Sequence, residues 1–293
     1  MKVTGFTFVR NAVKLDYPVV EAISSILPLC DEVIVLVGNS EDTTPELIRS
    51  INSPKIRIFD SVWDDSMREG GRVLAIETDK AMQHISPDTT WCFYIQADEV
   101  VHEDDYPAIR AAMEKYRDDQ RVEGLLFNYI HFYGTYDYVG DSRTWYKHEI
   151  RIVRNVKGLH SYKDAQGFRI DNRKLYVKPV NARIHHYGWV KDNRTAGFEK
   201  WKNTILLYHG HDKEKTDAIL SSNWFDYTGI DSLAKFKGTH PAVMKEHIAR
   251  KNWEFEHDIS KKQFKNFTKK MLYWIERWTG KRLFDYRNYK LLR

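Results

Sequence analysis

Apolar stretches and amphipathic stretches alternate through the first 120 residues, and this alternation limits the fold more than any other feature of the chain. Glu32–Val37 is an almost unbroken apolar run, typical of a central parallel strand that is covered on both faces. Tyr17–Leu29 instead spaces its apolar residues along one helical face. The repeated order of strand and helix predicts an α/β fold with a doubly wound, mostly parallel sheet, whose ligands bind at the carboxyl ends of the strands. The other expected strands are Val3–Val9, Lys55–Val62 and Thr90–Ile95, and the other expected helices are Asp42–Ser50, Gly71–Gln83 and Asp104–Arg117.

The pattern changes after Val122. Gly124–Tyr133, Glu149–Val153 and part of Leu175–Tyr187 have the composition of strands, and from Asn193 onward the apolar spacing is helical. We therefore divide the chain into an α/β domain, residues 1–190, and a helical extension, residues 191–293. His209 and His211 are expected at the surface of this extension.

Composition and charge exclude several classes of protein. Hydrophobic residues make up 42% and charged residues 30% of the chain, which excludes a disordered or fibrous protein. The apolar runs are far shorter than the roughly 20 residues that cross a bilayer, and the N-terminus lacks a signal-peptide core. Cys30 and Cys92 stand in apolar surroundings, as buried thiols do in a reducing compartment. We therefore expect a cytoplasmic protein, and the net charge of +5 does not indicate a nucleic-acid partner.

Residues 261–293 form a basic, aromatic-rich tail. They contain eleven Lys and Arg and two acidic residues, so that the tail carries +9 and the rest of the chain −4. Two interpretations stay open. The apolar stripe packs on the body of the protein, or the helix lies on an anionic membrane surface and makes the protein peripheral to the inner face of the membrane. The stripe consists of Phe264, Phe267, Met271, Trp274 and Trp278, which recur at helical spacing.

Acidic residues follow the fourth expected strand. Asp98 and Glu99 come directly after it, at the rim where a parallel sheet binds its ligand. Carboxylates held at a strand end are oxygen ligands suited to a divalent cation that bridges two phosphates. We interpret Asp98 as a metal ligand, while Glu99 suits a structural role equally well. The acids at 103–105 open the next helix, where they suit the positive end of its dipole.

Other polar residues are expected near a bound nucleotide. Arg10 and Asn11 follow the first strand. Ser40 and Asp42 lie in the turn after the second strand, where capping of the next helix is the alternative role. Arg72 follows two glycines, which allow the backbone to approach a phosphate closely, although a plain loop is the alternative.

Two adjacent histidines, His185 and His186, stand late in the α/β domain. Neighbouring side chains of a strand point to opposite faces, so one of the two can reach a given site. An imidazole that joins Asp98 would complete a mixed nitrogen and oxygen site suited to Mn²⁺ or a similar ion. A buried structural histidine is the alternative.

Four motifs, in this order, resemble those of bacterial glycosyltransferase family 2 proteins. The resemblance covers about residues 1–190, and Phe236-Lys-Gly-Thr-His240-Pro is similar to the helical extension of one subgroup. It implies a GT-A fold, a nucleotide-diphosphate sugar donor, a divalent metal ion and transfer with inversion. The motifs are Phe8-Val-Arg-Asn11, Ser40-Glu-Asp42-Thr-Thr44, Gln96-Ala-Asp98-Glu99 and His185-His186-Tyr-Gly-Trp189.

The resemblance also implies roles for single residues. Asp98 matches the metal-binding acid of the Asp-X-Asp motif, His186 the histidine of the metal and diphosphate site, and Arg72 the basic residue near the nucleotide. Gln96, which we expect beside the nucleotide, replaces the first acid of the motif. Gly38 and the residue before it stand where the family carries an aspartate for the nucleobase, so that specificity for UDP does not follow.

The reaction implied by the resemblance is a direct displacement of the diphosphate by an acceptor hydroxyl. Mn²⁺ or Mg²⁺ on Asp98 and His186 would neutralise the charge that builds on the departing diphosphate. The expected partners are the donor and a glycan or lipid-linked acceptor, and nucleic acid is not among them.

A carboxylate must take the proton of the acceptor hydroxyl. Asp164 is the first candidate, because it lies in a polar run that is expected to form a loop over the site. Glu149 is the second, with pairing to Arg151 as its structural alternative. Asp137 and Asp141 are further candidates.

Two other functions stay open. A non-catalytic scaffold at the membrane surface that keeps a nucleotide-sugar fold would account for Gln96 and Gly38. A sugar nucleotidyltransferase would need a glycine-rich phosphate loop after the first strand, and residues 10–13 contain no glycine.

Overall fold

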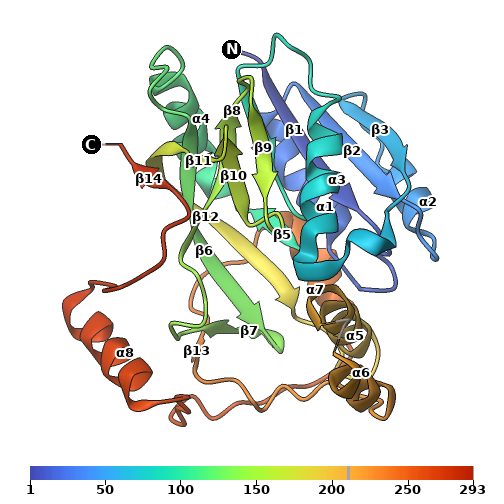
Figure 1. Cartoon of the computed structure of the whole chain (residues 1–293), viewed down its shortest axis with the longest axis vertical. Coiled ribbons are helices and arrows are strands. Elements are labelled where there is room, and N and C mark those ends of the chain that lie inside the picture. The colour runs from blue at the N-terminus through green and yellow to red at the C-terminus, as the bar shows by residue number, and fades with distance from the viewer. Residues whose placement is uncertain (210–211, 293) are drawn as a thin grey trace.

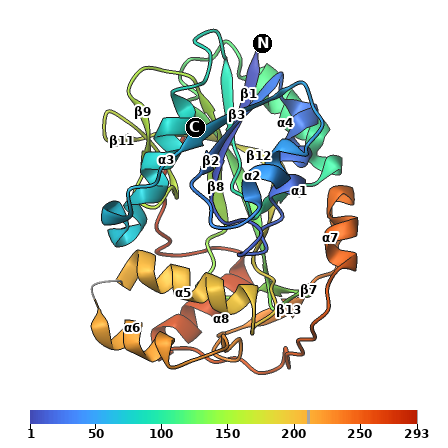
Figure 2. The same cartoon turned by 90° about the vertical axis from the view of Figure 1, so that its right-hand side faces the viewer.

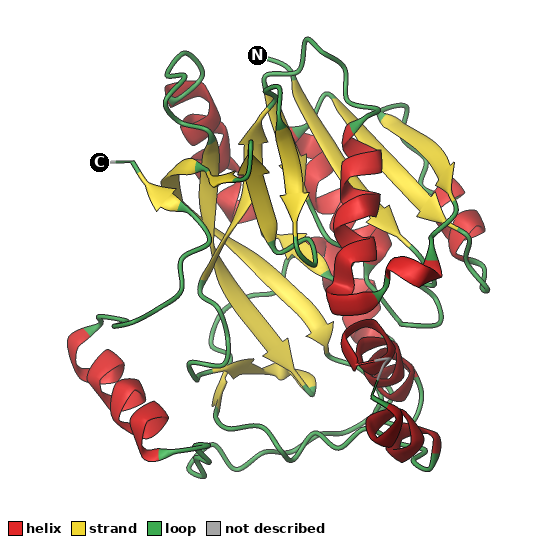
Figure 3. Cartoon of the chain, in the orientation of Figure 1, coloured by secondary structure: helices red, strands yellow, loops and turns green. Residues whose placement is uncertain are grey.

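The computed structural model describes residues 1–209 and 212–292. In this part of the chain, eleven strands form one sheet, and three further strands form a small second sheet (Figures 1 and 3). The expected surface position of His211 and of the His209 side chain lies outside the described residues.

The N-terminal half of the main sheet is parallel, with strand order β3-β2-β1-β4. β2 is buried on both sides: Val33, Val35 and Val37 pack in one core cluster, and Ile34 and Leu36 in another. This two-sided burial is the reason for the unbroken apolar run, and the predicted α/β fold is confirmed. The strands are β1 (Val3–Val9), β2 (Glu32–Gly38), β3 (Ile56–Ser61) and β4 (Trp91–Tyr94).

Helices cover both faces of this half (Figure 2). Residues of α1, α2 and α4 belong to one core cluster, and residues of α3 belong to the other together with the second sheet. The bounds are α1 (Val19–Ile26), α2 (Thr44–Arg49), α3 (Arg72–Met82) and α4 (Tyr106–Lys115), and the second sheet consists of β9 (Leu159–Tyr162), β10 (Gly167–Ile170) and β11 (Arg173–Lys174).

The other half of the sheet is mixed. β8 lies antiparallel between β4 and β6, and β12 runs parallel to β6. β5, β7 and β8 run against the remaining strands, so that most strands share one direction, as predicted. The bounds are β5 (Glu99–Val101), β6 (Gly124–Tyr133), β7 (Thr135–Gly140), β8 (His148–Arg154) and β12 (Tyr176–Trp189).

The segment after residue 190 contains the expected helices and also returns to the sheet. β13 (Leu233–Lys235) pairs with β7, and β14 (Lys290–Leu291) pairs with β12. The extension is therefore not entirely helical, and the division at residue 190 stays a prediction. Its helices are α5 (Ala196–His209), α6 (Lys213–Leu220), α7 (Lys245–Ala249) and α8 (Phe267–Thr279).

Two smaller expectations concern the cysteines and the membrane. Cys30 and Cys92 are buried free thiols, as predicted. Among residues 1–209 and 212–292, no helix combines the length and the apolar character needed to cross a bilayer.

Candidate functional site

A cavity of about 580 Å³ lies between helix α5 and the carboxyl ends of β1 and β4. β1 pairs with β2 on one side and with β4 on the other, so this is the point where the strand order reverses and where open α/β sheets bind ligands. The cavity brings together seven of the ten predicted site residues, namely Arg10, Asn11, Gln96, Asp98, Glu149, Asp164 and His186.

The other three predicted residues, Ser40, Asp42 and Arg72, lie outside this wall. Ser40 Oγ accepts the backbone N–H of Asn11 at 3.0 Å, and Asp42 accepts the backbone N–H groups of Lys14 at 2.7 Å and Thr44 at 3.0 Å. Arg72 lines a shallower neighbouring cavity. The polar groups of Ser40 and Asp42 thus hold the turns after β1 and β2, and a role in nucleotide binding stays a prediction for all three.

Asp98 forms an internal ion pair with a lysine of α5. Its Oδ2 accepts a hydrogen bond from Lys200 Nζ at 3.0 Å, and His186 Nε2 lies 3.5 Å from the same oxygen. Gly188 permits this close packing, because a Cβ there would lie 2.8 Å from Asp98 Oδ2. Burial alone would raise the pKa of Asp98, but the charges of Lys200 and His186 outweigh it and hold that pKa well below its usual value.

His131 sets the proton on the ring of His186. His131 Nε2 lies 2.8 Å from the carbonyl oxygen of Tyr146, which only accepts, so the hydrogen-bond network assigns the His131 proton to Nε2. Burial, together with the His186 charge, lowers the pKa of His131 to about 3. Neutral His131 therefore accepts at Nδ1 from His186 Nδ1, 3.0 Å away. This leaves His186 Nε2 as the ring atom that faces Asp98 Oδ2, 3.5 Å away.

Lys200 lies between two aromatic rings. Its ammonium is 4.8 Å from the centroid of Tyr17 and 5.4 Å from that of Trp189. Burial would lower the pKa of Lys200, but Tyr17 and Asp98 raise it above its usual value, so the side chain stays charged. The sequence analysis missed Lys200. The helical spacing could have indicated it, because Lys200 falls on the same buried side of α5 as Ala196 and Leu207.

The predicted metal ligands do not make a dication site as they lie. In the described part of the chain, no group of three or more His, Cys, Asp and Glu side chains is placed to hold a metal ion. Asp98 Oδ2 and His186 Nε2 supply two ligand atoms, and the Lys200 ammonium already stands at the shared oxygen. A divalent cation there would lie against a fixed positive charge. These distances favour Lys200 as the counter-charge of Asp98.

Glu99, next to Asp98, has a structural role. Arg151 donates Nε and Nη2 to its two carboxylate oxygens, both at 2.7 Å, and Tyr129 donates its hydroxyl at 2.8 Å. Both members of the pair are fully buried. Arg151 therefore pairs with Glu99, and the structural alternative for Glu149, a pair with Arg151, is wrong.

We expect Glu99→Gln to lower the free energy of unfolding by about 3–5 kcal/mol, because it leaves the buried Arg151 charge without a counter-charge. Chemical denaturation measures the loss. Replacing both Glu99 and Arg151 with Met should restore most of the stability. Arg121→Gln, at an exposed ion pair with Asp119, is the control and should change the free energy of unfolding far less. If Glu99→Gln loses no more stability than the control, the Glu99–Arg151 pair does not have this structural role.

The two candidate bases differ in how they are held. Asp164 lies in the turn between β9 and β10, and both of its oxygens are engaged, one by Tyr208 Oη at 2.7 Å and one by Gln166 Nε2 at 2.8 Å. Glu149 is buried at the start of β8, and its Oε2 has no hydrogen-bond partner within the described residues. Burial raises the pKa of Glu149 to about 8, with Arg151 opposing the shift and Glu99 adding to it. Glu149 is thus the carboxyl group that is free to exchange a proton.

An aromatic and basic region forms another part of the cavity wall, near the end of β1. The guanidinium of Arg10 lies 5.5 Å from the ring centroid of Trp63 and pairs with Asp65 at 2.9 Å. Arg68 pairs with the same carboxylate. The indole of Trp63 packs against Gly38. A flat aromatic face beside two guanidinium groups suits a nucleoside with its phosphates.

Comparisons with known proteins place this chain in no sequence family. No protein-family model matches it, and no curated protein matches it significantly. Among solved structures, S. aureus TarS in complex with UDP has a TM-score of 0.39 at 14% identity over 75% of this chain and 70% of that chain. Glucosyl-3-phosphoglycerate synthase from Mycobacterium tuberculosis, solved with Mn²⁺, UDP and phosphoglyceric acid, has a TM-score of 0.29 at 18% identity over 44% and 43%.

A third similar structure is the 4-diphosphocytidyl-2C-methyl-D-erythritol synthase from Anaerococcus prevotii, with a TM-score of 0.37 at 11% identity over 65% of this chain and 89% of that chain. A longer TarS structure is also similar, and this chain spans 42% of its length. The similarity is distant and concerns the fold, and it assigns no function to any residue.

Proposed function

We propose that this protein transfers a sugar from a nucleoside diphosphate sugar to an acceptor hydroxyl, with inversion at the sugar carbon. The observation that carries the proposal is that two groups of opposite chemical character line one cavity, at the point where the strand order of the sheet reverses. One is a buried ammonium, Lys200, and the other is the buried carboxyl group of Glu149, whose Oε2 has no hydrogen-bond partner among the described residues. The displacement needs both, because negative charge develops on the leaving diphosphate while a proton leaves the acceptor.

Lys200 supplies the positive charge for the leaving group. In the free protein this charge is balanced by Asp98. A diphosphate that enters the cavity would lose its contacts with water and gain a contact with the Lys200 ammonium. The two aromatic rings keep the lysine stem in place, so little reorganisation accompanies the reaction. Asp98 and His186 then position Lys200, and no step is routed through a metal ion.

Glu149 serves as the base in this proposal, ahead of Asp164. A base must be able to accept a proton near neutral pH, which a carboxyl group with a raised pKa does well. Asp164, with both oxygens engaged, instead links the β9–β10 turn to Tyr208 of α5. We assign it to positioning of the cavity wall.

The aromatic and basic region near β1 is the proposed nucleoside site, with Trp63 as the stacking face and Arg10 and Arg68 near the phosphates. The acceptor, a glycan or a lipid-linked sugar, would enter next to Glu149. A nucleotidyltransferase remains less favoured, because the turn after β1 at Arg10 and Asn11 offers no glycine-rich loop for a triphosphate.

The test is a panel of UDP, GDP and dTDP sugars, with release of nucleoside diphosphate measured in the presence and absence of EDTA. We expect slow hydrolysis of one donor class without an acceptor, with or without EDTA. Thermal shift with the same nucleotides serves as a binding assay. Binding without hydrolysis or transfer would favour the scaffold. If the chain neither binds nor hydrolyses any of these donors, the proposal is wrong.

A further inference from the structure

Helix α8 presents its apolar stripe to solvent. Phe267 is 78% and Trp278 79% exposed, and Met271 and Trp274 between them are also exposed. Phe284 and Tyr286, which follow the helix, are also exposed, and Phe284 is 90% exposed. Four of the five stripe residues therefore face solvent, and the interpretation that they pack on the body is wrong; Phe264, before the helix, is half-buried against the ring of Tyr273. Figure 1 shows α8 at the edge of the molecule.

The opposite side of α8 holds the helix to the body. Tyr273 and Glu276 are its buried residues. Tyr273 donates its hydroxyl to Asp141 at 2.7 Å, and Arg277 donates to the same carboxylate at 2.8 Å. Asp141, one of the further candidates for the base, is thus an anchor of this helix.

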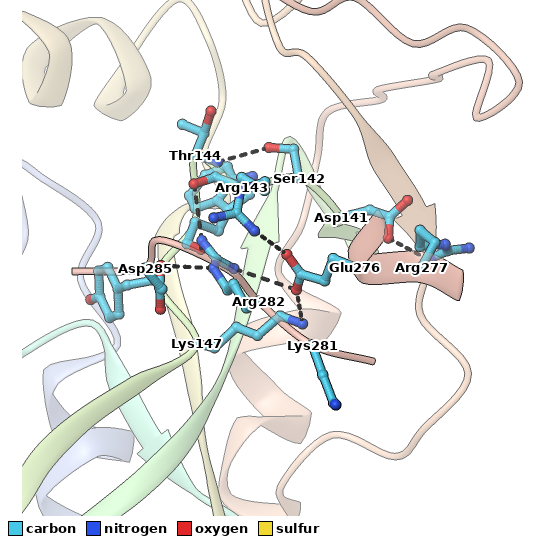
Figure 4. A network of polar contacts seen from close by, with 12 residues as sticks. Asp141, Ser142, Arg143, Thr144, Lys147, Glu276, Arg277, Lys281, Arg282 and Asp285 are labelled. Atoms are coloured by element: carbon cyan, nitrogen blue, oxygen red, sulfur yellow. Dashed lines mark hydrogen bonds and ion pairs between the residues drawn. The ribbon is translucent and has the colours of Figure 1, made fainter. Parts of the chain in front are cut away.

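Glu276 is the second anchor, and it gathers basic residues from two segments (Figure 4). Arg143 donates to it at 2.8 Å, Lys147 pairs with it closely, and Arg282 lies 3.9 Å away. Asn266 caps the start of the helix through the N–H of Lys269, and Gly280 ends it. Glu276, the acidic residue of α8, therefore faces inward, and the network fixes the orientation of the exposed stripe.

Lysines without an ion pair lie on α8 and next to it. Within the described residues, the four lysines between residues 265 and 281 are exposed and form no ion pair, and Lys281 points away from the Glu276 network (Figure 4). Lys270 lies next to the stripe, while Lys269, four positions before Tyr273, lies on the buried side of the helix. The surface is thus apolar along its centre and rich in aromatic rings, with positive charge beside it, which is the pattern of a helix that lies in a membrane interface. The four are Lys265, Lys269, Lys270 and Lys281.

We propose that the exposed face of α8 binds an anionic lipid bilayer, with Phe267, Met271, Trp274 and Trp278 inserted among the headgroups. The charge argues against a second copy of the chain as the occupant, because a symmetric pairing would bring the same lysines together. Anionic headgroups neutralise them. Tyr146 lines both the main cavity and the cavity beneath α8, so this surface lies close to the candidate site.

The test measures binding of the whole chain to vesicles of phosphatidylcholine, with and without phosphatidylglycerol. We expect binding to the anionic vesicles only, and weaker binding as salt is raised. Phe267→Ser with Trp278→Ser should weaken it at least about tenfold, because both side chains leave the interface. Lys270→Gln with Lys281→Gln should weaken it about 25-fold, since each lysine near an anionic surface contributes roughly fivefold.

Matched controls change exposed residues far from α8. Val62→Ser replaces an apolar side chain that is 74% exposed, and Lys115→Gln with Lys245→Gln removes two charges from other helices. Both controls should bind vesicles as the unchanged chain does, and all variants should keep the melting temperature.

Three outcomes would overturn the proposal. One is no binding of the unchanged chain to anionic vesicles. Another is equal loss in the controls. The third is a dimer in solution that Phe267→Ser with Trp278→Ser dissociates, without any vesicle binding, which would identify a second copy as the occupant.

Discussion

Lys200→Met should lower the rate of donor hydrolysis and of transfer by about 10²–10³. Methionine keeps the length and the packing of the stem between Tyr17 and Trp189 but removes the ammonium that faces the leaving diphosphate. We expect the loss in kcat rather than in KM, because charge on the diphosphate grows in the transition state. Steady-state kinetics with the best donor of the panel measure it. Lys213→Met, an exposed position on α6, is the control.

The same variant separates lysine from metal. In the unchanged chain, Lys200 stands at Asp98 Oδ2, so EDTA should leave activity intact. In Lys200→Met that charge is gone, but Asp98 Oδ2 and His186 Nε2 still supply two ligand atoms, so we expect no tight Mn²⁺ binding there, as titration followed by electron paramagnetic resonance would show. Full loss of activity in EDTA, with Lys200→Met still active, would assign the charge to a metal ion instead.

Glu149→Gln should lower the rate of transfer by about 10²–10⁴, the usual contribution of a general base. A base works only when it is deprotonated, and burial raises the pKa of Glu149 to about 8. The rate of the unchanged chain should therefore increase roughly tenfold per pH unit below pH 8 and level off above it. Glu149→Gln should lose this dependence. Asp164→Asn is the matched variant and should keep it.

Stability gives a second readout for Glu149. Its pKa in the folded chain lies above the ordinary glutamate value of 4.5, so the folded state holds the proton more tightly than the unfolded state. The stability contributed by the protonated group is complete below about pH 4.5 and is lost as the pH rises toward 8. Glu149→Gln should therefore melt at a higher temperature than the unchanged chain at pH 8 to 9. A lower melting temperature together with an unchanged pH profile would contradict the assignment.

Local patterns predicted the elements and the place of the site. The strand predicted at Val3–Val9 has these bounds in the structure, because alternation and β-branched residues act within a few neighbours. Asp98 and His186 were expected to meet, and they do so at 3.5 Å, since strand ends of one sheet share an edge. The sequence also predicted Glu149 as the second candidate for the base.

Ion pairs between residues that are distant in sequence could not be predicted from local patterns. A pair with Arg151, two residues away on the same strand, was the structural alternative for Glu149, but Arg151 makes its bidentate pair with Glu99 of β5, a strand that pairs with β12. Lys200 reaches Asp98 across 102 positions of sequence, because α5 crosses the end of the sheet. The spacing of apolar residues within one segment does not indicate where a helix crosses a sheet.

Residue spacing within single segments was enough to establish the order of strands and helices, the edge of the sheet where polar residues collect, and the existence of an amphipathic basic helix. Three other features became known only from the folded chain: which charge balances Asp98, which carboxyl group is left without a partner, and which side of α8 faces solvent. These features depend on contacts between distant segments, whose free energies arise from burial and pairing in the folded state.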